Sequence, residues 1–240
     1  MNQKAISLKD KINKGEICVG AVTSVDIGRD ELKKIVETGE YDYLSIDSQH
    51  APFNEEKTVE FCNMVSDLNT HVQFRIKHTR HSYLIGNMLD LGPQGIEVPQ
   101  VELVETAEES VKNFYYPKVG LRSWGGANRY GFGNNTDRLE YAKWWNQYGV
   151  LWLQIESIYA VEKVNMFALP GVDCLSFGPA DLTFNLESNP NYRLKNVDEC
   201  VQEVVDKLAG TNTKVCFRNY TKETREKYID MGVTVFLERP

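Results

Sequence analysis

Two acidic side chains, Glu156 and Asp181, each follow a short apolar segment that is typical of a buried strand. Glu156 ends the segment Leu153-Gln154-Ile155-Glu156, and Asp181 lies in Gly178-Pro179-Ala180-Asp181. Because no Cys is nearby, the two carboxylates would form a hard, oxygen-rich site of the kind that binds Mg²⁺ or Mn²⁺. We therefore predict a divalent-metal site, provided that the fold brings the two carboxylates together.

Other strand ends offer groups suited to the chemistry of a 2-oxo acid. Arg75 is a permanent cation and a bidentate hydrogen-bond donor, and His50 can exchange protons near neutral pH. The backbone N–H groups of Gly178 and Ala180 could bind a carboxylate, since no bulky side chain shields them. Cleaving a carbon–carbon bond beside a 2-oxo acid requires an enolate, whose oxygen the metal and Arg75 would stabilise while His50 moves the hydroxyl proton.

These residues need elements that carry them to one place. Apolar strand-like segments alternate with amphipathic helical segments, which favours a parallel sheet, and eight such units indicate a closed (β/α)8 TIM barrel. Active sites of that fold are assembled at the carboxyl ends of the strands. We predict one domain spanning residues 1–240, with strands at residues 17–23, 41–46, 71–77, 95–98, 150–155, 172–177, 213–217 and 233–237.

Two breaks in the repeat and the end of the chain carry further expectations. A Gly- and Asn-rich segment, 115–136, separates two consecutive predicted helices, so its Arg122 and Arg129 could reach the catalytic face; the alternative is a solvated surface crossing. A loop is expected from Leu182 to the helix that begins at Val197. The helix that should follow the last strand is absent, so we expect an exposed apolar flank that another subunit of a homo-oligomer covers.

Composition excludes several classes of function. The formal net charge is −7, and no basic stripe is evident, which argues against nucleic-acid binding. The sequence shows neither an apolar leader nor a window long enough to span a membrane. The five Cys are odd in number and mostly lie in apolar segments, as expected of reduced core residues in a cytoplasmic protein.

Three segments taken together resemble the signature segments of the HpcH/HpaI family of class II pyruvate aldolases, within the phosphoenolpyruvate/pyruvate-type barrel superfamily. They are Tyr41–Pro52, Leu153–Glu156 and Phe177–Leu182, and the similarity extends from about Leu8 to Leu237. The resemblance implies a (β/α)8 barrel and a divalent cation, Mg²⁺, Mn²⁺ or Co²⁺. It implies these site residues: Glu156 and Asp181 for the metal, Arg75, Gln154 and Ala180 for pyruvate, His50 paired with Asp90 as the base, and Arg122 near the second substrate.

Two residues depart from the family pattern. Gln49 stands where many relatives carry Glu, which removes a charge beside His50. Val22 stands about where some relatives have an aromatic residue, which would widen the aldehyde pocket. Both departures leave the metal chemistry intact and bear on the choice of substrate.

We therefore expect a metal-dependent lyase that reversibly cleaves a 4-hydroxy-2-oxo acid to pyruvate and an aldehyde. One alternative is cleavage of a 3-hydroxyacyl-CoA thioester, or another reaction of a pyruvate-type enolate. Coenzyme A would require a basic groove for its phosphates, which only the segment 122–129 or Lys77–Arg80 could provide. The other alternative is a barrel that binds a ligand without turnover.

Overall fold

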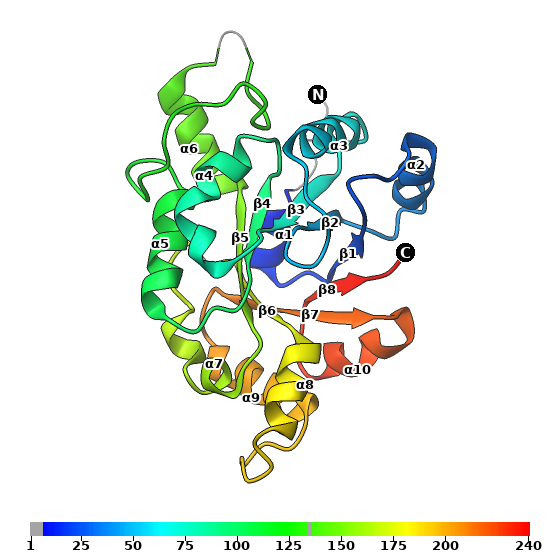
Figure 1. Ribbon diagram of the computed structural model, residues 1–240, viewed down its shortest axis with the longest axis vertical. Helices are drawn as coiled ribbons and strands as arrows, with labels where there is room; N and C mark the ends of the chain where they lie inside the picture. Colours follow the sequence, from blue (N-terminus) through cyan, green and yellow to red (C-terminus); the bar gives the residue numbers. More distant parts are fainter. Residues whose placement is uncertain (1–6, 134–135) are drawn as a thin grey trace.

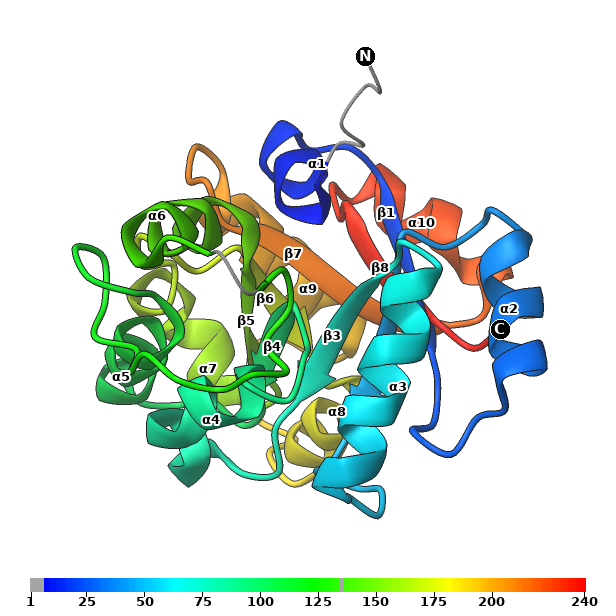
Figure 2. The ribbon, with the colours of Figure 1, turned by 90° about the horizontal axis from the view of Figure 1, so that it is seen from above.

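The computed structural model describes residues 7–133 and 136–240, and these form a closed barrel of parallel strands in chain order (Figure 1). The predicted (β/α)8 fold is confirmed. Seen from above, the helices surround the strands (Figure 2). The strands are β1 Cys18–Val22, β2 Tyr43–Asp47, β3 His71–Arg75, β4 Gly95–Val98, β5 Val150–Ile155, β6 Cys174–Phe177, β7 Lys214–Tyr220 and β8 Val235–Glu238.

The helices begin where local capping signals predict. Asn54 caps α3 by accepting a hydrogen bond from the Lys57 N–H, and Asp137 caps α6 through the N–H groups of Leu139 and Glu140. The α-helices are α1 Leu8–Lys14, α2 Arg29–Glu37, α3 Glu55–Asp67, α4 Ile85–Leu89, α5 Val104–Phe114, α6 Arg138–Tyr148, α7 Ile158–Glu162, α8 Pro179–Glu187, α9 Val197–Leu208 and α10 Arg225–Asp230. Short 3-10 helices span Thr79–Leu84, Val164–Met166 and Lys222–Thr224.

The segment after β6 differs from the prediction. The first part of the loop expected from Leu182 is helix α8, which starts at Pro179 and is separated from β6 by Gly178 alone. Proline suits the first helical position because its φ is already helical and an N–H at that position would have no intrahelical acceptor. Asp181 consequently lies in the first turn of a helix, where the helix dipole favours a negative charge.

Strand β7 is longer than predicted and carries polar residues into the barrel. The sequence suggested an end at Phe217, but the strand runs to Tyr220, with an irregular register against β8 beyond Phe217. Arg218 and Asn219 therefore belong to the strand, and both side chains are buried. The predicted end at Phe217 was too early because a charged residue such as Arg218 usually lies outside a strand, unless the charge has a partner in the interior.

The predicted exposed flank beside β8 is also wrong. Phe236, in the middle of β8, is 0% exposed. It belongs to the large buried apolar cluster that also contains Leu32 of α2 and Tyr228 of α10, so this part of the strand is covered within the chain. The expectation of a homo-oligomer consequently gains no support from this part of the barrel.

The barrel encloses a core of its own at the end where helix α1 lies. Apolar residues of α1, such as Ile12, pack with inward-facing side chains of the strands, including Tyr43 and Trp152. Buried Lys9 of α1 anchors this end: its Nζ lies 2.8 Å from Asp173 Oδ2 and 2.9 Å from the Tyr115 hydroxyl. All five Cys are buried and free, as predicted.

Within the described ranges, no helix combines the length and the apolar character needed to cross a membrane.

One prediction concerns buried His71 on β3, whose imidazole lies 3.3 Å from the Gln73 side-chain oxygen. Burial lowers the pKa of His71 from 6.5 to about 3. The unfolded chain binds this proton below about pH 6.5 while the folded chain does not, so stability is complete above that pH and decreases as the pH falls. We expect this residue to cost about 2 kcal/mol of unfolding free energy between pH 7 and pH 5.

Urea unfolding of the wild type and of His71→Asn at both pH values measures this contribution. The variant should lack the loss that His71 causes, whereas His78→Asn, which removes an exposed His, should behave like the wild type. An identical pH dependence in the wild type and His71→Asn would contradict the prediction.

Candidate active site

The two predicted metal-binding carboxylates lie next to each other. Glu156 directly follows β5, and Asp181 is in the first turn of α8. Glu156 is buried, and its Oε1 has no hydrogen-bond partner among the residues that the structure describes. Burial and the adjacent charge of Asp181 together raise the pKa of Glu156 to about 8. Two adjacent carboxylates, one of them with a buried oxygen that has no partner among the described residues, form a donor set of the kind that binds a divalent cation.

Both carboxylates line a cavity of about 660 Å³. Mg²⁺ and Mn²⁺ commonly take one or two protein carboxylates and keep their other positions for water and substrate, so the donor set fits such an ion. Across the described ranges, no cluster of three or more His, Cys, Asp or Glu could hold a metal ion. The assignment of Glu156 and Asp181 as its protein ligands stays a prediction, in which substrate oxygens would complete the shell.

Arg75 is held in position by a neighbouring strand. Its Nε donates to Asp47 Oδ1 at 2.8 Å and its Nη2 to Asp47 Oδ2, while its Nη1 donates to Gln154 Oε1 at 3.3 Å. Although burial opposes it, the Arg75 hydrogen bonds and charge lower the pKa of Asp47. The sequence pointed to Arg75 and Gln154 but not to Asp47 as the anchor, although Asp47 ends the adjacent strand.

Gly178 and Ala180 were both expected to donate a backbone N–H to the substrate carboxylate, and the structure bears on the two residues differently. The Gly178 N–H donates to the Ile155 carbonyl oxygen at 3.2 Å, so its predicted role as a carboxylate donor is wrong. Gly178 matters because it has no side chain: a Cβ there would lie 2.0 Å from Glu156 Oε2. Ala180 is in the first turn of α8, where backbone N–H groups lack intrahelical acceptors. Its pyruvate-binding role stays a prediction.

The expected pairing of His50 with Asp90 is not formed within the chain. His50 is exposed just after β2 and makes no hydrogen bond in the part of the chain that the structure describes. Asp90, at the end of α4, forms an ion pair with Arg122, whose Nη2 lies 2.8 Å from Asp90 Oδ1. Arg122 is buried, with its guanidinium 4.8 Å from the Tyr116 ring and 4.6 Å from that of Trp145.

Most of the described residues in the segment 115–136 are exposed, as the surface-crossing alternative expects, but Arg122 and Arg129 themselves are buried. Arg129 is buried, and its guanidinium lies 3.8 Å from the Trp124 ring and 4.1 Å from that of Phe132. Stacked cations and aromatic rings make this segment a packed layer against α6. Arg122 and Arg129 therefore cannot provide a basic groove for phosphates, which leaves Lys77–Arg80 as the remaining candidate.

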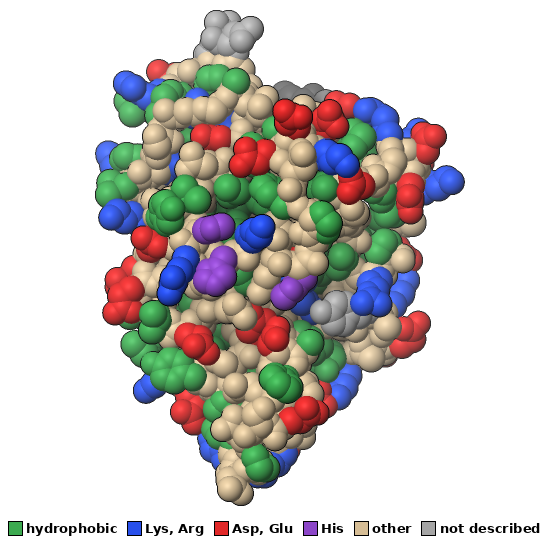
Figure 3. All heavy atoms as spheres, in the orientation of Figure 1, with side chains coloured by type: hydrophobic (Ala, Val, Ile, Leu, Met, Phe, Trp, Pro, Cys, Tyr) green, Lys and Arg blue, Asp and Glu red, His purple; other side chains and the backbone are tan. Residues whose placement is uncertain are grey.

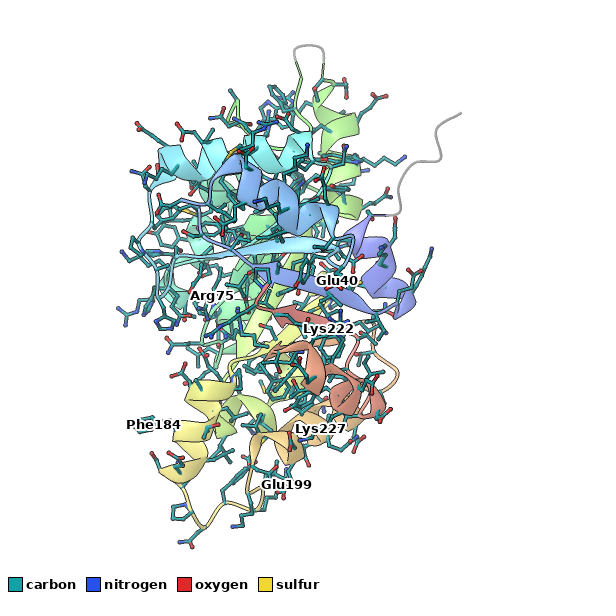
Figure 4. All side chains as sticks on the ribbon, turned by 90° about the vertical axis from the view of Figure 1, so that its right-hand side faces the viewer. Glu40, Arg75, Phe184, Glu199, Lys222 and Lys227 are labelled. Carbon is teal, nitrogen blue, oxygen red and sulfur yellow. The ribbon has the colours of Figure 1, made fainter. Side chains whose placement is uncertain are left out.

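The cavity extends from the carboxylates across the loops after β3 and β4 to α8. Its lining includes the basic residues His78 and Arg80 and the apolar residues Leu103 and Phe184. The space-filling view shows His, Lys and Arg side chains gathered near the centre of one face, with acidic side chains below them (Figure 3). Arg75 and Phe184 lie on the same side of the molecule (Figure 4). This space is much larger than pyruvate and leaves room for a second substrate.

Sequence reasoning missed a second group of polar residues inside the barrel. Glu97 of β4 accepts a hydrogen bond of 2.5 Å from the Ser176 hydroxyl and forms an ion pair with Arg218 of β7. The available signal was Glu97 itself, a lone charged residue in the short strand Gly95–Val98. Its partner could not be identified because Arg218 lay beyond the predicted end of β7.

Comparison with known proteins gives consistent matches over most of the chain. The family model described as HpcH/HpaI aldolase/citrate lyase matches residues 27–228. A hydroxypyruvate/pyruvate aldolase of Delftia acidovorans is 28% identical over 205 residues, covering 83% of this chain and 74% of the relative. A 2-keto-3-deoxy-L-rhamnonate aldolase of Escherichia coli is 27% identical over 239 residues, covering 93% and 83%.

Among solved structures, the HpcH/HpaI aldolase from Desulfitobacterium hafniense superimposes with a TM-score of 0.85 at 26% identity. The match covers 98% of this chain and 90% of that one. The barrel and its connections are therefore shared along almost the whole length.

The close approach of Gly178 to Glu156 gives a prediction for cation binding. In Gly178→Ala the new Cβ must displace the Glu156 carboxylate, so we expect Mn²⁺ affinity to fall about tenfold to a hundredfold. Gly28→Ala is the matched control, because a Cβ at Gly28 would meet nothing within 4 Å. Titration calorimetry with Mn²⁺ measures both variants. Equal affinity in Gly178→Ala and the wild type would show that Glu156 is not a ligand.

Proposed function

Since this chain belongs to the HpcH/HpaI aldolase/citrate lyase family, we propose that it is a divalent-metal-dependent lyase that reversibly cleaves a 4-hydroxy-2-oxo acid to pyruvate and an aldehyde. Family membership makes the chain an enzyme of the aldolase type. The metal dependence and the class of substrate are our proposal beyond family membership. The observation that carries them is the coupled pair Glu156 and Asp181, which shares the mouth of the barrel with the anchored Arg75.

Glu156 and Asp181 would hold the cation. When bound there, a divalent cation supplies Lewis-acid stabilisation of the oxygen that becomes negative as the carbon–carbon bond breaks. Gly178 leaves the space that the Glu156 carboxylate occupies beside the start of α8, because a Cβ at this position would lie 2.0 Å from Glu156 Oε2.

Arg75 is suited to binding the keto oxygen of the 2-oxo acid. Its Nε and Nη2 are occupied by Asp47, which fixes the plane of the guanidinium. The edge that carries Nη1 makes only the 3.3 Å contact with Gln154, so it can donate to a substrate oxygen. Because this donor is oriented before the reaction, it can stabilise a developing negative charge without reorganising in the transition state.

Binding and proton transfer fall to three further residues. Gln154 accepts from Arg75 through its oxygen, which leaves its amide N–H groups available to the substrate carboxylate. The backbone N–H of Ala180 in the first turn of α8 is a second donor for that carboxylate. His50, exposed at the end of β2, would accept the proton from the substrate's 4-hydroxyl as the bond breaks and return it in the reverse direction.

The acyl-CoA alternative has less support. Of the two basic segments that could bind the phosphates of coenzyme A, the one at Arg122 and Arg129 is buried against aromatic rings. The cavity wall at His78 and Arg80 is the one of the two that remains.

The test is pyruvate release from a panel of 4-hydroxy-2-oxo acids, followed with a coupled lactate dehydrogenase assay. We expect turnover that EDTA abolishes and that Mg²⁺ or Mn²⁺ restores. Glu156→Ala should reduce kcat by about a hundredfold or more, because the cation loses one of two protein ligands. Glu102→Gln, at the exposed edge of the same cavity, should retain wild-type turnover.

Turnover that persists both in EDTA and in Glu156→Ala would refute the metal-dependent mechanism. Pyruvate binding with no cleavage of any panel member would favour a barrel that binds ligand without turnover.

A further inference from the structure

Arg75 has a carboxylate beside it on each of the two adjacent strands, Asp47 on β2 and Glu97 on β4. Strand register aligns Asp47 of β2 with Arg75 and Arg75 with Glu97 of β4, so the three residues form one row across adjacent strands. Side chains of equivalent register point to the same side of a parallel sheet, and all three enter the interior of the barrel. Among the residues that the structure describes, Arg75 nevertheless forms an ion pair with Asp47 and none with Glu97. The question is what keeps Glu97 away from it.

Both oxygens of Glu97 are bound by residues from strands that do not neighbour β4 in the sheet. The Ser176 hydroxyl of β6 donates to Oε1 at 2.5 Å, and the Arg218 guanidinium of β7 pairs with Oε2. Two strands, β5 and β6, lie between β4 and β7 in the sheet, so this ion pair crosses the barrel interior. Glu97 is 0% and Arg218 is 7% exposed.

Removing only the Arg218 charge would leave Glu97 as an unneutralised anion inside the barrel. A buried charge without a partner is strongly unfavourable, so Glu97 would be driven toward another cation. Arg75 occupies the adjacent register position, and its Nη1 edge is held only by the 3.3 Å contact with Gln154. That edge is the one that can donate to a substrate oxygen, so Glu97 and the substrate would compete for it.

We infer that Arg218 is a positioning residue that holds Glu97 away from Arg75 and thereby keeps the Nη1 edge of Arg75 available to the 2-oxo acid. This inference rests on the proposed function, because it takes Arg75 to be the group that binds pyruvate. Arg218 acts through Glu97 and Arg75 and need not touch the substrate. Arg75 should therefore stay available when both Glu97 and Arg218 lose their charges, but not when Arg218 alone loses its charge.

A double-mutant cycle separates this role from simple support of the fold. We expect Arg218→Met to weaken pyruvate binding in the presence of Mg²⁺ by about tenfold to a hundredfold, the usual effect of losing a hydrogen bond to a charged group. Adding Glu97→Gln to it removes the competing charge and should restore the affinity to within about threefold of the wild type. Arg193→Met, which breaks the exposed pair with Glu203, is the matched control and should have no effect.

Titration calorimetry with pyruvate measures the cycle, and thermal unfolding of each variant reports its stability. A purely structural role would lower stability without selectively weakening pyruvate binding, and Glu97→Gln would not rescue that binding. Should Arg218→Met fail to fold, Arg218→Gln keeps a hydrogen-bond donor for Glu97 while removing the charge. It should show a smaller loss of affinity that Glu97→Gln again reverses.

A crystal structure of the folded Arg218 variant tests the inference independently of catalysis. Arg75 hydrogen-bonded to Glu97 would support it, and Arg75 still paired only with Asp47 would overturn it. Undiminished pyruvate affinity in that variant would also overturn it while leaving the lyase assignment intact. Absence of pyruvate binding by the wild type would instead count against the proposed function, and the position of Arg75 would still decide the role of Arg218.

Discussion

The ion pair between Arg75 and Asp47 is the interaction on which the rest of the site depends. It joins the ends of two adjacent strands and fixes the plane of a guanidinium at the mouth of the barrel. An arginine has five N–H donors in a rigid fork, so occupying Nε and Nη2 determines where Nη1 points. That edge then faces Gln154, and through Gln154 the arrangement reaches β5, where Glu156 follows.

A second constraint is the close packing at the junction of β6 and α8. Gly178 allows the start of the helix to approach Glu156 and Gln154 more closely than any residue with a Cβ would permit. The same junction places Asp181 and the Ala180 N–H in the first helical turn. The proposed cation ligand, the proposed substrate donor and the glycine that leaves room for Glu156 therefore all lie within four consecutive residues.

Buried charges are distributed along the barrel axis in two different ways. Near α1, Lys9 and Asp173 form a closed ion pair that ties the helix to the barrel. Nearer the mouth, Arg218 neutralises Glu97, which lies in the same row across the strands as Arg75. A buried pair is weak evidence for stability by itself, because desolvation offsets much of the attraction. The position of the second pair is what suggests a role in keeping the site open.

The strands, the helix caps at Asn54 and Asp137, and the polar strand ends could all be predicted from the sequence, because each depends on local periodicity or on neighbours a few residues away. Helix α8 was missed although its signal, Pro179 at the first position, is local. The pairing of Arg218 with Glu97, and of Asp90 with Arg122, could not be predicted. Those partners are 121 and 32 positions apart, and only the closed barrel and its packed outer layer decide which buried charge meets which.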